Sequence, residues 1–227
     1  MADLTPTQTL IPNQAIPECA QAFTERIHGL LDGQPKDEAT VAEALDGMDE
    51  LIDRIAAALY TVASMLVGEG EQSIRLVEEA IANADISACA NPVEARHSSR
   101  RALCAAALDA LTQRDPLSLA PPQGLQPASS CIDEDDLDSA GVSSEELQTM
   151  IAGPNRDRVR KWLESLPIIV RTIFVLRAVA GLTTQETIDQ LKAHGGPAAS
   201  AWTPDALREL FRQGLCSLAS HVLQEAR

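Results

Sequence analysis

The sequence predicts an all-α fold made of two helical domains joined by an acidic, proline-rich linker. Hydrophobic residues make up 45% of the 227 residues and aromatic residues only 3%, so the core has to be built from Ala, Leu, Val and Ile. These apolar residues recur with a period near 3.6, which is typical of amphipathic helices, and few stretches alternate as strands do. A chain of this length suits two small domains.

The N-terminal half predicts a helical domain over residues 18–115. Residues 1–17 contain three prolines and are expected to be a flexible lead-in to it. Four stretches in this half have the composition and the start and stop signals of helices. We expect these helices at residues 17–33, 37–70, 71–86 and 91–115.

Two of these expected helices have a well-defined apolar face. In the second, apolar residues follow one another at steps of three or four positions, namely Leu51, Ile55, Leu59, Val62 and Leu66. In the third, the same spacing predicts burial of Ile74, Val77 and Ile81.

The segment 116–153 predicts a linker between two domains. Its first part holds four prolines, two glycines and a cluster of acids, a composition from which no core is expected. Its end, at residues 143–153, predicts a short helix with Ser143 as N-cap and Gly153 at its close.

Residues 154–227 predict the second helical domain. Its helices are expected at 156–166, 167–181, 183–196 and 203–226. Thr203 is the expected N-cap of the last helix, because Pro204 follows it at the first helical position.

The charge is divided unevenly along the chain, whose net value is -15. Residues 154–227 hold ten Lys or Arg and seven Asp or Glu, a balance of +3, whereas the remaining residues have a balance of -18. By simple electrostatics, only the C-terminal third therefore suits a phosphate backbone, and it is only weakly basic.

The five cysteines are scattered and include no C-x-x-C pair. This pattern predicts a reducing compartment and argues against a disulfide scaffold or a zinc site. Cys104 and Cys216 are expected to pack as small hydrophobic residues on apolar helix faces. The N-terminus lacks the basic region of a signal peptide, and the apolar runs are too short to cross a membrane. We therefore expect a soluble, cytoplasmic protein with no membrane partner.

The sequence predicts no enzyme activity, no cofactor and no metal site. The four histidines lie far apart without ligand spacing, and neither a nucleophile motif nor a phosphate-binding loop is found. We assign no catalytic residue, so the expected function is binding.

The run LPIIVRTIFVLRAVAGLTTQETIDQL, at residues 166–191, is the most specific motif in the chain. An apolar helix ends at Gly181, and Thr183 or Thr184 then caps the next helix, with Glu186 placed to complete a capping box. A turn and a further helix follow, which is the order of a helix-turn-helix. The run resembles region four of the bacterial sigma factors, particularly those of the extracytoplasmic-function class. The matching residues are Leu166, Pro167, Arg171, Phe174, Leu176, Arg177, Gly181, Leu182, Thr183, Glu186, Ile188 and Leu191.

The first predicted domain resembles region two of the same family more faintly. Three segments follow the order of the family's helices, at residues 59–70, 73–81 and 101–114. The whole resemblance covers residues 50–115 and 158–224.

The resemblance implies a transcription initiation or regulatory factor that binds core RNA polymerase and, weakly, promoter DNA. It implies a second domain built as a helix-turn-helix-like bundle. It assigns polymerase binding to Leu76, Val77 and Glu79. It assigns DNA binding to Thr203, Arg208 and Arg212 of the last helix and to Arg96, Arg100 and Arg101 of the first domain.

The chain departs from the family pattern in both DNA-contacting segments. Residues 82–99 contain no aromatic side chain that could stack on unpaired bases. In the last helix, which would be the recognition helix, three positions where the family has arginine are Leu210, Gln213 and Leu215. The turn before this helix is also longer than a tight helix-turn-helix corner.

Two hypotheses of different class therefore stand side by side. The first is the sigma-like factor, and the second is a sigma-shaped protein-interaction module that binds, for example, an anti-sigma factor without recognising promoters. A helical protein of unrelated role is a third. Three roles are open for the acidic linker. It could thread a basic channel of the polymerase, act as a solvated spacer, or fold back on the C-terminal domain. Engagement of Arg208 and Arg212 by Asp205, Glu209 or the linker would favour the second hypothesis.

Overall fold

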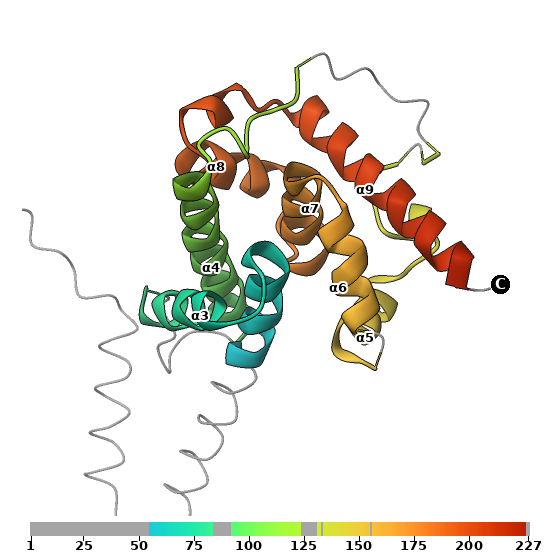
Figure 1. The fold of residues 1–227 in the computed structure, drawn as a ribbon, viewed down its shortest axis with the longest axis horizontal. Helices are drawn as coiled ribbons and strands as arrows, with labels where there is room; N and C mark the ends of the chain where they lie inside the picture. Colours follow the sequence, from blue (N-terminus) through green and yellow to red (C-terminus); the bar gives the residue numbers. More distant parts are fainter. Residues whose placement is uncertain (1–54, 84–91, 124–130, 133, 155, 226–227) are drawn as a thin grey trace, which may run out of the picture.

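The computed structural model describes residues 55–83, 92–123, 131–132, 134–154 and 156–225, and every regular element among them is helical (Figure 1). This confirms the all-α prediction for these residues. The lead-in at 1–17 and the helix expected at 17–33 lie outside them. The elements are a helix over 55–67, α3 (Glu71–Asn83), α4 (Pro92–Arg114), η1 (Asp138–Ala140), α5 (Ser144–Ala152), α6 (Arg156–Ser165), α7 (Ile168–Phe174), η2 (Val175–Val179), α8 (Thr184–His194), η3 (Pro197–Ala201) and α9 (Pro204–Glu225).

Three helices begin at the caps that the sequence predicts. The Ser143 hydroxyl accepts a hydrogen bond from the Glu146 N–H, and the Glu146 carboxylate accepts one from the Ser143 N–H, so α5 has a complete capping box. Thr183 and Glu186 form the same box at the start of α8. Thr203 Oγ1 accepts a backbone N–H from the first turn of α9 at 3.3 Å. These side chains satisfy amide groups that the first turn of a helix leaves without partners.

The burial pattern of the first helices agrees with the prediction in one case and corrects it in another. In the helix over 55–67 the expected apolar face is buried. In α3 the expected Ile74 is 49% exposed, because α3 packs on α4 through a neighbouring stripe of its surface. That buried stripe is Ser73, Leu76, Val77 and Ala80.

The helix expected at 167–181 is divided into α7 and the π-turn η2. The Ala180 N–H donates to the Val175 carbonyl, five residues back, at 2.8 Å. Gly181 then adopts φ 74°, a left-handed conformation that glycine takes without steric cost. This corner turns the chain so that Leu182, only 1% exposed, enters the core ahead of α8.

The predicted linker contributes to the core, contrary to expectation. Its apolar residues Leu119, Ile132, Ala140 and Val142 are all buried. The buried indole of Trp202 donates a hydrogen bond to the Leu119 carbonyl at 2.9 Å. The composition of the segment suggested a solvated spacer, but single apolar residues between its prolines and acids are enough to hold it against the helices.

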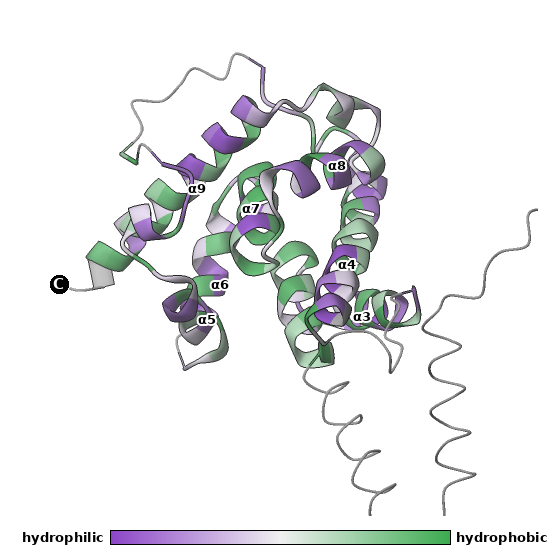
Figure 2. Ribbon diagram, turned by 180° about the vertical axis from the view of Figure 1, so that it is seen from behind, coloured by the Kyte–Doolittle hydropathy of each residue, from purple (hydrophilic) through white to green (hydrophobic). Residues whose placement is uncertain are grey.

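Helices from the two halves of the chain pack directly on each other, and their buried residues form one continuous cluster. The α4 helix lies against α8 (Figure 1). Figure 2 shows the largely hydrophobic α7 between α9 on one side and α4 on the other. Polar contacts add to the packing: Arg156 and Arg160 of α6 both pair with Glu69, at 2.7 and 2.6 Å. Within the described part of the chain, no helix is both long and apolar enough to span a bilayer.

Candidate nucleic-acid interface

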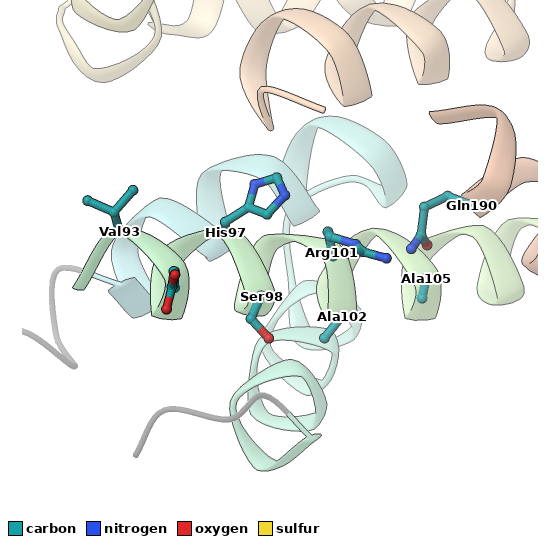
Figure 3. Close-up of a pocket in the computed structure, with 8 residues that line it drawn as sticks. Val93, His97, Ser98, Arg101, Ala102, Ala105 and Gln190 are labelled. Atoms are coloured by element: carbon teal, nitrogen blue, oxygen red, sulfur yellow. The ribbon is translucent and has the colours of Figure 1, made fainter. Parts of the chain in front are cut away.

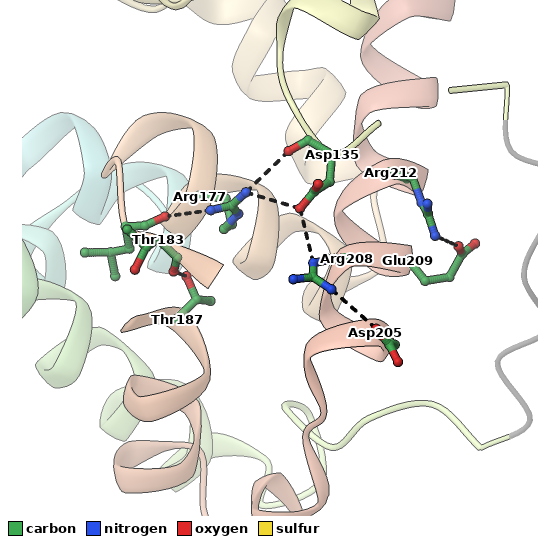
Figure 4. Close-up of polar contacts among 9 residues, drawn as sticks. Asp135, Arg177, Thr183, Thr187, Asp205, Arg208, Glu209 and Arg212 are labelled. Carbon is green, nitrogen blue, oxygen red and sulfur yellow. Dashed lines mark hydrogen bonds and ion pairs between the residues drawn. The ribbon is translucent and has the colours of Figure 1, made fainter. Parts of the chain in front are cut away.

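The predicted recognition helix, α9, carries two arginines, and Figure 4 shows both of them paired with carboxylates. Arg208 is 47% exposed, and its guanidinium lies 3.4 Å from Asp205 Oδ1 in the same helix and 3.8 Å from Asp135 Oδ2 in the linker. A phosphate oxygen would have to displace these carboxylates in order to bind Arg208.

The second arginine of α9 is paired with a buried acid. Arg212 Nη2 lies 2.8 Å from Glu209 Oε2, and Glu209 is 6% exposed. Gln213 Nε2 also donates to Glu209, at 3.5 Å. A carboxylate removed from water needs its cationic partner, so Arg212 cannot turn to a phosphate without leaving Glu209 buried and charged.

Arg177, one of the residues that carry the family resemblance, ties the linker to the corner between η2 and α8. It donates to the Leu182 carbonyl at 3.2 Å and to the Asp135 carbonyl at 3.3 Å, and it pairs with the Asp135 carboxylate at 3.5 Å. Its guanidinium also lies over the Phe211 ring, 4.9 Å from the centroid. Burial lowers the pKa of Arg177, while Asp135 acts in the opposite direction.

A hollow of about 300 Å³ separates the linker from the corner. Asp135 and two further linker aspartates line one wall, and Arg177, Thr183 and Phe211 line the other. The linker acids therefore stand where an anionic ligand would approach the corner.

The three arginines predicted to bind DNA from the first domain lie on α4, and they differ in exposure. Arg96 and Arg101 are exposed, whereas Arg100 is half-buried. A Cβ added at Gly181 would lie 3.9 Å from Arg100 Nη1, so Arg100 is directed toward the corner that precedes α8. Burial lowers the pKa of Arg100, and the charge of Arg96 lowers it further. Arg100 is therefore part of the contact between the two halves.

Arg101 lines a hollow of about 530 Å³ along α4, together with His97 and Gln190 (Figure 3). His97 is directed to α8, where Nε2 lies 2.8 Å from Glu186 Oε1. The backbone hydrogen bond from Thr183, with smaller contributions that include His97, lowers the pKa of Glu186 to about 2. The α4 helix, whose arginines were expected to bind DNA, therefore contacts the start of α8 through His97.

The residues assigned to polymerase binding are not presented together. Leu76 and Val77 are 6% and 8% exposed and belong to the core, so in this conformation neither side chain offers a docking surface. Glu79 is exposed on α3. These three residues were assigned from the resemblance to region two, and a sequence motif does not show which stripe of an amphipathic helix is buried.

The expectation of no disulfide is wrong, since Cys131 of the linker and Cys216 of α9 are bonded. Their Cα atoms lie 5.8 Å apart, and 85 positions separate them in the sequence. Cys216 was expected to pack as a small hydrophobic residue, and it does lie partly buried against the core. Cys104 is free and buried, as predicted. Scattered cysteines in a sequence cannot reveal which pair the fold brings together.

The described residues include no group of three or more His, Cys, Asp or Glu able to hold a metal ion. Comparison with protein-family models, with curated proteins and with solved structures gives no match for this chain. The geometry of α9, the corner and the linker is therefore the basis for assigning a function.

Proposed function

We propose that this chain is a sigma-shaped protein-interaction module that does not recognise promoter DNA in the conformation described. The observation that supports it is the pairing of Arg208 with Asp135 and Asp205, and of Arg212 with Glu209. These were the two arginines left on the recognition helix for phosphate contacts, and acids of the same chain neutralise both.

The net charge of the whole chain also argues against DNA binding. The net charge is -15, and only the C-terminal third has a positive balance. Two phosphate contacts would give weak and salt-sensitive binding even if both arginines were released. A surface of this sign repels DNA and is better suited to a protein partner, such as an anti-sigma factor.

DNA binding by the oxidised protein tests the first half of the proposal. We expect anisotropy of a short labelled duplex to give a Kd weaker than about 10⁻⁴ M at physiological salt, the weak limit of non-specific binding. The R208A/R212A double variant should bind no differently from wild type. R75A/R114A, which removes the same charge elsewhere, is the control. Tight binding that R208A/R212A weakens, with a flatter salt dependence, would contradict the proposal.

Co-purification from the protein's own cells tests the second half. Tagged protein should retain a protein partner other than core RNA polymerase. Retention of polymerase in its place would favour the sigma-like factor.

The sigma-like factor remains the second candidate, and two observations favour it. The capping box that the motif predicts, of Thr183 with Glu186, is present at the start of α8, and Glu79 is exposed on α3. If this candidate is correct, the E79A variant should lose polymerase while E78A, a change at an adjacent exposed acid, should retain it.

A further inference from the structure

We propose that the Cys131–Cys216 disulfide is a site of thiol–disulfide exchange, and that its reduction by a dithiol exposes Arg208 and Arg177 to phosphate. The interaction module would then have a second state, the reduced protein, in which these arginines are available to bind phosphate. It rests on the proposed function in one respect, namely that Asp135 neutralises these arginines while the bond is intact.

The bond and the pair of Arg208 with Asp135 both join the linker to α9. Arg208 and Cys216 are eight residues apart in this helix, which is a little over two turns. Arg208 and Cys216 are about 12 Å apart along the helix axis at the usual rise per residue.

The linker contacts α9 at the same two positions in the opposite order. Asp135 follows Cys131 by four positions, which covers about 13 Å when the chain is nearly extended. Cys131 is bonded to Cys216, and Asp135 pairs with Arg208. The linker therefore lies antiparallel to α9, and the disulfide sets the register that places Asp135 on Arg208 and Arg177.

Without the bond, this part of the linker is held by the buried Ile132 and by the contacts of Asp135 with Arg177 and Arg208. Ile132 is buried, but the acids Glu134, Asp135 and Asp136 follow it closely on a chain that is strongly negative overall. The ion pair of Asp135 with the half-exposed Arg208 is of the kind that contributes little to stability on its own. Loss of the covalent bond therefore frees the acids to move away from α9.

Of the two bonded residues, Cys131 is the more accessible to a reductant. Cys131 is exposed, whereas Cys216 is half-buried on α9. A thiolate of the dithiol attacks Sγ of Cys131, the Sγ–Sγ bond breaks, and Cys216 leaves with the electron pair and takes up a proton. The second thiol of the reductant then displaces Cys131. The products are two cysteine thiols and the oxidised reductant, a transfer of two electrons and two protons.

The test compares DNA binding by the full chain in its oxidised form and after treatment with dithiothreitol. A labelled duplex of mixed sequence is titrated by anisotropy at low and at higher salt. We expect the reduced protein to bind roughly tenfold more tightly at low salt and with a steeper salt dependence, since each added phosphate contact steepens the slope by about 0.9. The C131S variant should bind like the reduced protein whether or not dithiothreitol is present.

A variant that removes the charge of Asp135 but keeps the disulfide distinguishes the effect of the acid from that of the bond. D135N in the oxidised protein should raise DNA affinity as reduction does. E145Q removes the same charge from the exposed start of α5, and Glu145 does not line the hollow beside Arg177, so this variant should leave affinity unchanged. Circular dichroism of each variant verifies that the helices remain folded.

The outcomes distinguish this inference from the proposed function. Equal, weak binding by oxidised and reduced protein would overturn the inference and leave the interaction module in place. Tight binding by the oxidised protein would contradict the proposed function itself. Failure to detect the bond by thiol titration of protein prepared without reductant would also overturn the inference.

Discussion

His97 on α4 and Glu186 on α8 meet at 2.8 Å, although 89 positions separate them in the sequence. Glu186 also completes the capping box with Thr183. One carboxylate thus stabilises the start of the helix that follows the corner and joins that helix to the other half of the chain.

This arrangement predicts an acid-dependent loss of stability. Glu186 has a pKa of about 2 in the folded protein, against an ordinary value of 4.5. Because the pKa of Glu186 is lower in the folded than in the unfolded protein, its ionised carboxylate stabilises the fold in full at pH values above 4.5. This stabilisation is lost as the pH falls from 4.5 toward 2. After allowance for solvent screening, we expect ionised Glu186 to contribute about 1 to 2 kcal/mol to the free energy of unfolding.

The matched variant is E186Q, which keeps hydrogen-bonding atoms at this position but cannot ionise. Urea unfolding between about pH 6 and pH 3 should show a shallower decline for E186Q than for wild type. Parallel curves for the two proteins would show that Glu186 makes no such contribution.

Trp202 should be more sensitive to substitution than the other tryptophan. W202F leaves the Leu119 carbonyl buried without its donor, which costs about 1 to 3 kcal/mol. Trp162 donates to the hydroxyl of Ser217, which can turn to another partner, so W162F should cost less. Urea unfolding of both variants measures the difference, and equal losses would contradict the role of the hydrogen bond.

Loss of the disulfide should lower global stability in addition to its effect on the linker. The bond closes a loop across 85 positions, and removal of a bond of this kind costs about 2 to 4 kcal/mol. Thermal unfolding of wild type should shift downward on addition of dithiothreitol. The melting temperature of C131S should not respond, and a response would indicate that the reductant acts elsewhere.

Cys104 should resist alkylation until the protein unfolds. It is fully buried, and burial raises the pKa of its thiol to about 12. The reactive species is the thiolate, which this environment suppresses. In a C19S/C89S background under reducing conditions, iodoacetamide should label Cys131 and Cys216 within minutes and Cys104 only in urea. Mass spectrometry of the peptides follows the labelling, and early labelling of Cys104 would contradict its burial.

The local elements of the fold could be predicted from the sequence, because their causes lie within a few residues. The capping boxes of Ser143 with Glu146 and of Thr183 with Glu186 each use two residues three positions apart, and both are present. The all-α class follows from the helical period of the apolar residues. Local spacing did not predict the π-turn after α7, which departs from the regular helical period.

The buried face of α3 could not be chosen from its own sequence. Ile74 and Leu76 belong to overlapping stripes of one amphipathic helix, and packing on α4 buries the second. The candidate interface depended even more on distant residues. Arg208 and Arg212 could be named from the motif, but the partner Asp135 comes from a segment whose composition suggested a spacer.

By itself, the sequence determined the helical class, most helix starts and which arginines lie on the predicted recognition helix, α9, since these depend on neighbours along the chain. Only the tertiary structure decided which charges meet and which cysteines bond. Asp135 reaches Arg177 across 42 positions, and Cys131 reaches Cys216 across 85. Contacts of that range depend on how helices pack, because the charge and burial of a side chain depend on all the segments folded around it.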